Sequence, residues 1–210
     1  MRGRFITLEG IEGVGKTTQV VNVSATLERL GRSCCLTREP GGTPLAEAIR
    51  ELVLAPRAES VPGSAELLLM FAARAVHVDN LILPTLAAGT DVICDRFTDA
   101  TYAYQGGGRG VSPSNIEWLE TLTHEQLQPD LTLLLDAPPA LALGRARKRS
   151  DADRFEAETL AFFTRVRAAY LARAQGAPQR FVIIDAAASL EHVTSQVCAA
   201  VEQAAHRWRA

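Results

Sequence analysis

Short apolar runs recur along the chain, separated by longer segments in which apolar residues return every three or four positions. The short runs are rich in Val, Ile, Leu and Phe, which is typical of β-strands. They occupy residues 4–9, 33–37, 91–94, 131–135 and 181–184. The last two are almost continuously apolar, as expected for strands of a parallel sheet that is covered on both faces.

The longer segments carry the apolar period of amphipathic helices. In the first of them, Val20, Val23, Leu27 and Leu30 repeat at helical spacing up to Gly31, a residue type that commonly ends helices. The predicted helices cover residues 15–30, 44–54, 65–82, 98–104, 113–126, 139–148, 156–174 and 189–207. Strands that alternate with helices predict an α/β fold, a five-stranded parallel sheet flanked by helices.

Two polar segments interrupt this pattern. Residues 105–110 contain four glycines around Arg109, and residues 147–154 are dense in charge. Both compositions are typical of mobile loops that close over a ligand. We therefore expect a single domain, residues 1–210, with a short flap at about residues 147–155.

Composition narrows the class of protein. A chain of 210 residues, 47% of them hydrophobic, is long enough for one well-buried domain and short for two. The net charge of −2 indicates neither a nucleic-acid nor a membrane partner. No apolar stretch approaches the ~18–20 residues of a membrane span, and the N-terminal segment reads as a strand and not as a signal peptide.

The cysteines indicate in which compartment the protein works. Cys34, Cys35, Cys94 and Cys198 show no metal-ligand spacing, and the adjacent Cys34 and Cys35 would face opposite sides of a strand. Four free thiols suit a reducing compartment. We therefore expect a cytoplasmic protein.

Residues 10–17 read GIEGVGKT and complete the pattern G-x-x-x-x-G-K-[ST] between the first predicted strand and the first predicted helix. This context is the one in which the pattern binds phosphate, because backbone N–H groups and the helix N-terminus turn towards the anion. Lys16 would reach the outer phosphates, and the Thr17 hydroxyl would ligate Mg²⁺. The motif predicts a nucleoside-triphosphate site, with ATP bound by Gly10, Ile11, Glu12, Gly13, Val14, Gly15, Lys16, Thr17 and Thr18.

GTPases, ATP-driven machines and kinases all use such a loop. A GTPase is disfavoured because no asparagine precedes a lysine and no aspartate has a glycine three positions on, and a machine usually needs extra domains. A kinase needs a second anion site for its acceptor. Arg38 follows the second predicted strand and Asp95-Arg96 follows the third, so all three would meet the phosphate loop at one edge of the sheet. There Asp95 could hold Mg²⁺ and Arg96 a phosphate; a structural salt bridge between them is the alternative.

Four further motifs stand in order along the chain. Residues 37–43 read TREPGGT, residues 95–97 DRF, residues 103–110 AYQGGGRG and residues 153–156 DRFE. Together with the phosphate loop they resemble the bacterial thymidylate kinase family, from the first strand to the last helix. The resemblance implies a P-loop nucleoside-monophosphate-kinase fold and a homodimer that transfers the γ-phosphoryl group of ATP to dTMP, giving dTDP and ADP.

The resemblance also implies a dTMP site made of Glu12, Arg38, Arg50, Met70, Phe71, Arg74, Arg96, Thr101, Tyr104 and Gln105. Glu12 would lie at the 3′-hydroxyl of the deoxyribose, and Tyr104 would fill the space of a 2′-hydroxyl. Thr101 and Gln105 would face the thymine edge. Arg38, Arg96 and Arg50 would bind the phosphate of dTMP.

Three positions depart from the family pattern. Four residues before Arg74, where an aromatic ring would stack on thymine, stands Met70, with Phe71 shifted by one. Either the polarizable Met70 lies against the base or Phe71 reaches in from the next position, and core packing is the alternative for both. Ala100 stands where relatives often have serine, so that hydrogen bond to the nucleotide is either missing or supplied by Thr101.

The third departure is Gly13, where one subgroup of the family carries a catalytic arginine. The resemblance then points to flap arginines as cations at the transferring phosphoryl group, Arg149 first and Arg147 second. With Lys16, Arg96 and Glu12 they complete the predicted catalytic set.

Two rival functions stay open. A kinase for dUMP or for a deoxynucleoside shares every ATP-side residue and differs only in its acceptor pocket. A nucleotide-binding regulator without turnover is disfavoured by the intact Lys16, Thr17, Asp95 and Arg96.

The remaining polar residues have structural expectations only. Asp136, at the end of the fourth strand, is expected to cap the next helix. His77, His124, His192 and His206 are expected to face solvent or the edge of the core.

Overall fold

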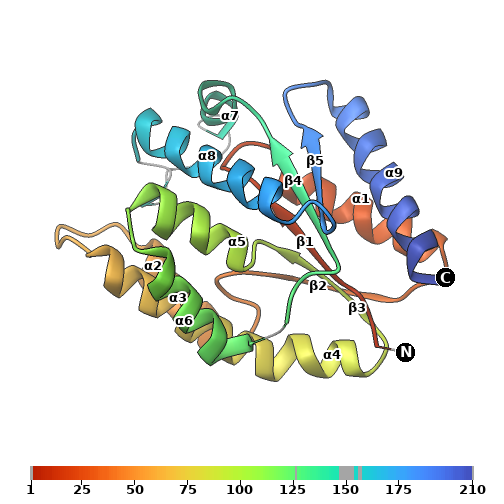
Figure 1. Ribbon diagram of the computed structural model, residues 1–210, viewed down its shortest axis with the longest axis horizontal. Coiled ribbons are helices and arrows are strands. Elements are labelled where there is room, and N and C mark those ends of the chain that lie inside the picture. The colour runs from red at the N-terminus through yellow and green to blue at the C-terminus, as the bar shows by residue number, and fades with distance from the viewer. Residues whose placement is uncertain (1, 126, 147–153, 156–157, 210) are drawn as a thin grey trace.

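The computed structural model describes residues 2–125, 127–146, 154–155 and 158–209 (Figure 1). Its sheet consists of β1 (Phe5–Glu9), β2 (Cys34–Arg38), β3 (Asp91–Asp95), β4 (Leu131–Asp136) and β5 (Phe181–Asp185). All neighbouring strands are parallel, in the order β2-β3-β1-β4-β5. The prediction of five parallel strands is confirmed, with each end placed to within one residue.

The central strand β1 pairs with β3 and β4, with Leu8 opposite both Asp95 and Leu133. The loop that follows β1 therefore leaves the sheet beside the carboxyl ends of its neighbours. This is the edge at which ligands bind in open parallel sheets.

Helices cover both faces of the sheet (Figure 1). On one face, α1 (Lys16–Arg29) packs against α9 (Leu190–Arg209). The other face carries α8 (Leu160–Gly176), with α5 (Thr98–Thr101) and the π-helical turn η2 (Tyr102–Gly108) against it. Further out, α2 (Pro44–Leu54), α3 (Gly63–His77) and α6 (Pro113–His124) lie side by side, and α7 (Pro139–Ala146) follows β4.

The predicted helix at residues 65–82 is longer than expected. After α3 the chain continues through the π-helical turn η1 (Val78–Ile82) into α4 (Leu83–Ala87) without leaving helical geometry. Pro84 lies inside this continuous run, directly after η1, where the π-helical turn already interrupts the regular hydrogen-bond pattern that a proline would break.

This continuous run also corrects the expectation that no segment reaches the length of a membrane span. Residues 63–87 form 25 helical residues, and the most apolar 18-residue window in them has a mean hydropathy of 1.4, which is long and apolar enough to cross a membrane. Its first part, α3, packs against α2 and α6. This packing accounts for only part of its apolar character, because Leu68 and Leu83 are exposed.

The prediction of a glycine-rich mobile loop at residues 105–110 was wrong. Most of this segment belongs to η2, which packs along α8. A Cβ on Gly107 would stand 2.6 Å from the Cβ of Ala169, and a Cβ on Gly108 would stand 2.5 Å from the ring of Phe162. The glycines are needed because α8 lies so close.

The other helices agree with the prediction to within four residues at each end, and α2 agrees at both ends. Of the predicted flap, residues 147–153 lie outside the described part of the chain, and only residues 154–155 are placed.

Candidate active site

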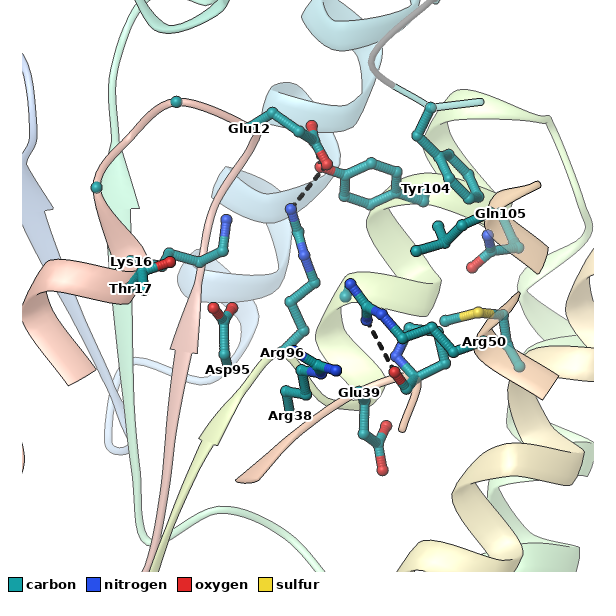
Figure 2. Close-up of a pocket in the computed structure, with 17 residues that line it drawn as sticks. Glu12, Lys16, Thr17, Arg38, Glu39, Arg50, Asp95, Arg96, Tyr104 and Gln105 are labelled. Atoms are coloured by element: carbon teal, nitrogen blue, oxygen red, sulfur yellow. Dashed lines mark hydrogen bonds and ion pairs between the residues drawn. The ribbon is translucent and has the colours of Figure 1, made fainter. Parts of the chain in front are cut away.

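A cavity of about 240 Å³ opens at the carboxyl edge of the sheet, where β1, β2 and β3 end (Figure 2). The phosphate loop forms one end, and side chains from α2, α3 and η2 form the other. The lining residues are Glu12, Gly13, Gly15, Lys16, Thr17, Arg38, Glu39, Pro40, Arg50, Leu54, Met70, Asp95, Arg96, Ala100, Tyr104, Gln105 and Phe155. The structure thus brings most of the predicted site residues into one cavity.

Lys16 is the first residue of α1, and its side chain folds back inside the phosphate loop. Its Nζ donates to the carbonyl oxygens of Gly10 and Ile11, at 3.1 and 3.0 Å. Burial and the nearby charge of Arg96 lower the pKa of Lys16 to about 8, against the opposing effect of Asp95. The ammonium is therefore close to losing its proton when no phosphate is present.

Gly13 shows why the loop has no side chain at this position. Its φ is +78°, and a Cβ would stand 1.9 Å from the carbonyl oxygen of Ala142 in α7. The loop rests directly on the backbone of that helix. An arginine at residue 13 has no room in this arrangement.

Asp95 ends β3 beside Lys16 and Thr17 (Figure 2). Its Oδ1 is buried and has no hydrogen-bond partner among the described residues. The described residues contain no cluster of three His, Cys, Asp or Glu side chains that could hold a metal by themselves. One carboxylate and one hydroxyl, completed by phosphate and water, match the way Mg²⁺ binds in kinases.

Arg96 pairs with Glu12 and not with Asp95, which removes the alternative of an Asp95–Arg96 salt bridge. Its guanidinium donates to Oε1 of Glu12 at 2.8 Å, to the carbonyl oxygen of Gly10 at 2.8 Å and to the Tyr170 hydroxyl at 3.1 Å. Arg96 also adopts a φ of +73°, which costs a non-glycine residue about 1–3 kcal/mol. Three hydrogen bonds hold it in place despite that cost.

Glu9 does not line the cavity but is linked to Arg96 through the Tyr170 hydroxyl, and sequence reasoning gave it no role. It is fully buried, and its carboxylate accepts from the backbone N–H of Phe97 at 2.7 Å and from the Tyr170 hydroxyl at 2.8 Å. Burial and the charge of Asp99 raise the pKa of Glu9 to about 8, although Arg96 acts against this shift. The only sequence signal was a charged residue at the end of an apolar strand.

Glu12 is held on both of its oxygens. While Oε1 accepts from Arg96, Oε2 accepts from the Tyr104 hydroxyl at 2.6 Å. The Arg96 guanidinium also lies over the Tyr104 ring, 4.9 Å from its centroid. The three side chains therefore form one unit at the cavity wall.

Arg74 is buried and does not line the cavity itself. Its Nε donates to Glu39 at 2.8 Å and its Nη2 to the hydroxyl of Thr101 at 3.0 Å, while Nη1 has no partner among the described residues. Burial alone would raise the pKa of Glu39, but Arg74 and His77 outweigh burial and hold it below its usual value.

Two histidines are buried, contrary to expectation. His77 bridges Glu39 and Thr37, at 3.0 and 2.7 Å. His124 contacts Thr98 at 2.8 Å, and burial, with the charge of Arg74 next, lowers its pKa to about 4. Only the expectation for His192 and His206 is confirmed, since both are exposed.

The two candidates for the base face lie in different places. Met70 lines the cavity. Phe71 does not, and is packed with Leu67, Ile116 and Leu119 in a separate apolar cluster. This placement favours Met70 as the side chain next to a bound base.

The predicted phosphate ligands on β2 and α2 also line the cavity. Arg38 pairs with Glu47 at 3.0 Å, and Arg50 donates to the carbonyl oxygen of Pro40 at 2.8 Å. Leu54 contributes to the wall without having been predicted.

Other expectations have mixed outcomes. Asp136 does not cap a helix, because both of its oxygens accept from Arg167 at 2.7 Å. Arg147 and Arg149 lie outside the described residues, so their predicted role stays a prediction. Phe155, just after the undescribed segment, lines the cavity and was missed.

Comparison with known proteins decides the family. Residues 8–197 match the family model described as thymidylate kinase. The chain belongs to the thymidylate kinase family. Thymidylate kinase of Pseudomonas putida strain GB-1 is 55% identical over 209 residues, covering 100% of both chains. That of Chromohalobacter salexigens is 56% identical over 208 residues, covering 98% of each.

A solved structure agrees. The crystal structure of thymidylate kinase from Ehrlichia chaffeensis has a TM-score of 0.77 and 33% identity, covering 96% of this chain and 99% of that one. The parallel five-stranded sheet is thus the P-loop nucleoside-monophosphate-kinase fold. A thymidylate kinase is a transferase that phosphorylates dTMP with ATP, and kinases of this kind generally use a divalent metal ion.

Proposed function

We propose that the cavity holds ATP and dTMP end to end, so that the γ-phosphoryl group passes to dTMP beside a Mg²⁺ ion and gives dTDP. One observation carries this proposal: the phosphate loop and a separate cluster of arginines open into the same cavity. Two anionic substrates need two such cation sets, whereas a simple triphosphate-binding protein needs one.

At the reacting end, Lys16 and Arg96 would stabilise charge on the transferring group, because phosphoryl transfer depends mainly on positioned cations. Thr17 and Asp95 would hold Mg²⁺, and the unpartnered Oδ1 of Asp95 supports this assignment. We infer that Arg149, with Arg147 second, supplies a further cation from the flap. Gly13 supports this inference, since the loop has no room for an arginine of its own.

At the base end, Oε1 of Gln105, an acceptor on the cavity wall, lacks a partner among the described residues, and so does Nη1 of Arg74, a donor that lies behind that wall and would have to be reached by the base. Thymine offers an acceptor at O4 beside a donor at N3, which is the complementary pattern. Cytosine offers the reverse pattern and would leave both protein atoms unpaired, which is costly in a buried site. Thr101 would orient Arg74, and Met70 would lie against the ring.

Between these ends, Glu12 and Tyr104 would border the sugar. Their mutual hydrogen bond of 2.6 Å holds the Tyr104 ring in place, and the ring would then occupy the space that a ribose 2′-hydroxyl needs. Arg38, Arg50 and Arg96 would bind the phosphate of dTMP. The proposal treats residues 1–210 as one kinase domain with a flap at about 147–155.

We infer that the working form is a homodimer. On α2, α3 and α6, which lie side by side, five large apolar side chains are exposed: Leu45, Leu52, Leu68, Trp118 and Leu122. Exposed apolar patches of this kind mark protein interfaces. If this face pairs two copies, Leu68→Asp should convert a dimer into a monomer in sedimentation velocity, and a monomeric parent protein would disprove the inference.

The chemistry also suggests where the enzyme works and what it does not bind. ATP and dTMP are its proposed partners, with no nucleic acid and no membrane, in keeping with the net charge of −2. The four free cysteines fit the cytoplasm.

A coupled assay of ADP release tests the reaction against dTMP, dUMP, dCMP and thymidine, with ATP and Mg²⁺. We expect dTMP to give the highest kcat/KM, with dCMP lower by about a hundredfold or more because two buried groups are left unpaired. A preference for dUMP or thymidine would support a rival kinase. No ADP release with any acceptor would support a regulator without turnover.

A further inference from the structure

A buried carboxylate, that of Glu66 on α3, stands next to the base end of the cavity. Glu66 is fully buried and lies one helical turn before Met70 and two turns before Arg74, so the three share one face of the helix. Its Oε1 accepts a hydrogen bond of 2.7 Å from Nε2 of Gln105, and its Oε2 accepts one of 2.6 Å from Nη2 of Arg154.

The bond to Glu66 sets the direction of the Gln105 amide. An amide has a donor end and an acceptor end, whereas a carboxylate can only accept. The Nε2 end of Gln105 must therefore face Glu66, and the Oε1 end faces away, buried and without a partner among the described residues. Gln105 itself lines the cavity.

Arg154 fixes which end of the side chain at residue 66 has to be a hydrogen-bond acceptor. Its Nε donates to the carbonyl oxygen of Val53 at 2.9 Å, and its backbone N–H donates to that of Leu54 at 3.3 Å. Arg154 is thus fixed in place as a donor, and a guanidinium cannot accept a hydrogen bond. Whatever stands at residue 66 must turn an acceptor towards it.

We propose that Glu66 is a positioning residue that sets base specificity: it forces Gln105 to present an acceptor to the base and so selects a pyrimidine with N3–H over a 4-aminopyrimidine. This inference rests on the proposed role of Gln105 at the base edge. Glu66 touches no substrate and acts through Gln105 alone.

The variant Glu66→Gln reverses the arrangement with almost no change in volume. Two arginines compete for its oxygen, and Arg154 has the closer contact, 2.6 Å against 3.4 Å for Arg109, so the oxygen faces Arg154 and the NH₂ group faces Gln105. Gln105 then has to turn Oε1 towards residue 66 and present its NH₂ group to the base. That donor suits the unprotonated N3 of cytosine and opposes the N3–H of thymine.

The test measures kcat/KM for dTMP and for dCMP in the purified full-length enzyme. In Glu66→Gln we expect the ratio of dTMP to dCMP to fall by about tenfold or more, because dTMP becomes worse while dCMP becomes better. The KM for ATP should change less than about twofold. A purely structural role would lower activity on both acceptors together and keep the ratio, which would overturn the inference.

Glu158 offers a matched control. Arg109 binds two carboxylates, that of Glu158 and, at 3.4 Å, that of Glu66. No contact between Glu158 and Gln105 is seen among the described residues. Glu158→Gln should leave the dTMP-to-dCMP ratio unchanged. If it lowers the ratio as Glu66→Gln does, the loss reflects the charge of the cluster and the inference is wrong.

A second comparison separates this inference from the proposed function. Gln105→Ala should lower the preference if Gln105 reads the base, and Arg74 would keep the remainder. If Gln105→Ala lowers the ratio and Glu66→Gln does not, only the positioning role fails. If neither variant changes the ratio, the proposed reading of the base by Gln105 fails as well.

The exchange variant Glu66→Gln/Gln105→Glu covers the case in which Glu66→Gln does not fold. It keeps one amide–carboxylate hydrogen bond and still offers an oxygen to Arg154. The carboxylate now stands at residue 105 and presents an acceptor to the base, so the preference for dTMP should return to within about tenfold of wild type. Loss of the preference in this variant would show that Glu66 acts for another reason.

Discussion

Arg74 and Glu39 face each other inside the protein, with Nε and Oε2 2.8 Å apart and with side chains that are 0% and 1% exposed. Removing one partner of such a pair leaves the other charge buried and unpaired. We therefore expect Arg74→Ala to lower the free energy of unfolding by ~3–5 kcal/mol. We also expect a KM for dTMP that rises far more than the KM for ATP.

The double variant Arg74→Met/Glu39→Gln separates these two effects. It removes both charges, so most of the stability should return in urea unfolding while the KM for dTMP stays raised. Equal changes in both KM values would show that Arg74 serves the structure and not the base site.

The pH dependence of ATP binding follows from Lys16. Its pKa is lowered to about 8, chiefly by burial, so the free enzyme loses this positive charge as the pH rises through that value. We expect kcat/KM for ATP to fall by about tenfold per pH unit above pH ~8. In the ATP complex the phosphates favour the charged lysine, so kcat should decline only at higher pH.

Glu9 titrates in the same range, since its pKa is raised to about 8 by burial and by Asp99. Glu9→Gln removes that titration and keeps the side-chain shape. If the alkaline fall in kcat/KM disappears in Glu9→Gln, the fall belongs to Glu9 and the assignment to Lys16 is wrong.

Neighbouring substitutions on α3 should differ in their effect on dTMP binding. Met70→Ala should weaken dTMP binding by about 1–2 kcal/mol, the range for losing a contact with a base, and should also lower stability because Met70 belongs to the main apolar core. Phe71→Ala should mainly destabilise the fold, by ~3 kcal/mol or more, because it empties an apolar cluster. Calorimetric titration with dTMP and thermal unfolding measure both. The reverse pattern would place the Phe71 ring on the base.

The flap prediction rests on the sequence and on Gly13. Arg149→Lys keeps the charge but loses the planar fork, so kcat should fall at least about tenfold while the affinities for ATP and dTMP change little. Arg147→Lys is the companion variant. If both variants keep nearly wild-type kcat in steady-state assays, the flap covers the site without donating a catalytic cation.

The strands and the phosphate loop could be predicted because their signals are local. A buried parallel strand is a continuous apolar run, and the loop motif spans eight adjacent positions, residues 10–17. Neither requires knowledge of a distant contact.

The failed predictions concern residues whose neighbours in the fold are distant in the sequence. The glycines of η2 have the composition of a mobile loop, and only the approach of α8 shows that they serve close packing. His77 has the spacing of an ordinary helical residue, yet Glu39, 38 positions away, makes it part of a buried network. Glu66 is a similar case, because its partners lie on η2 and beside the flap.

The close contact between Gly13 and α7 also has an evolutionary consequence. A lineage could not exchange a flap arginine for a loop arginine by one substitution, because any side chain at residue 13 would collide with the Ala142 carbonyl. The helix would first have to withdraw. If the flap supplies the cation as proposed, the two ways of supplying it are separated by a change in backbone position, which would make the choice heritable over long periods and difficult to reverse.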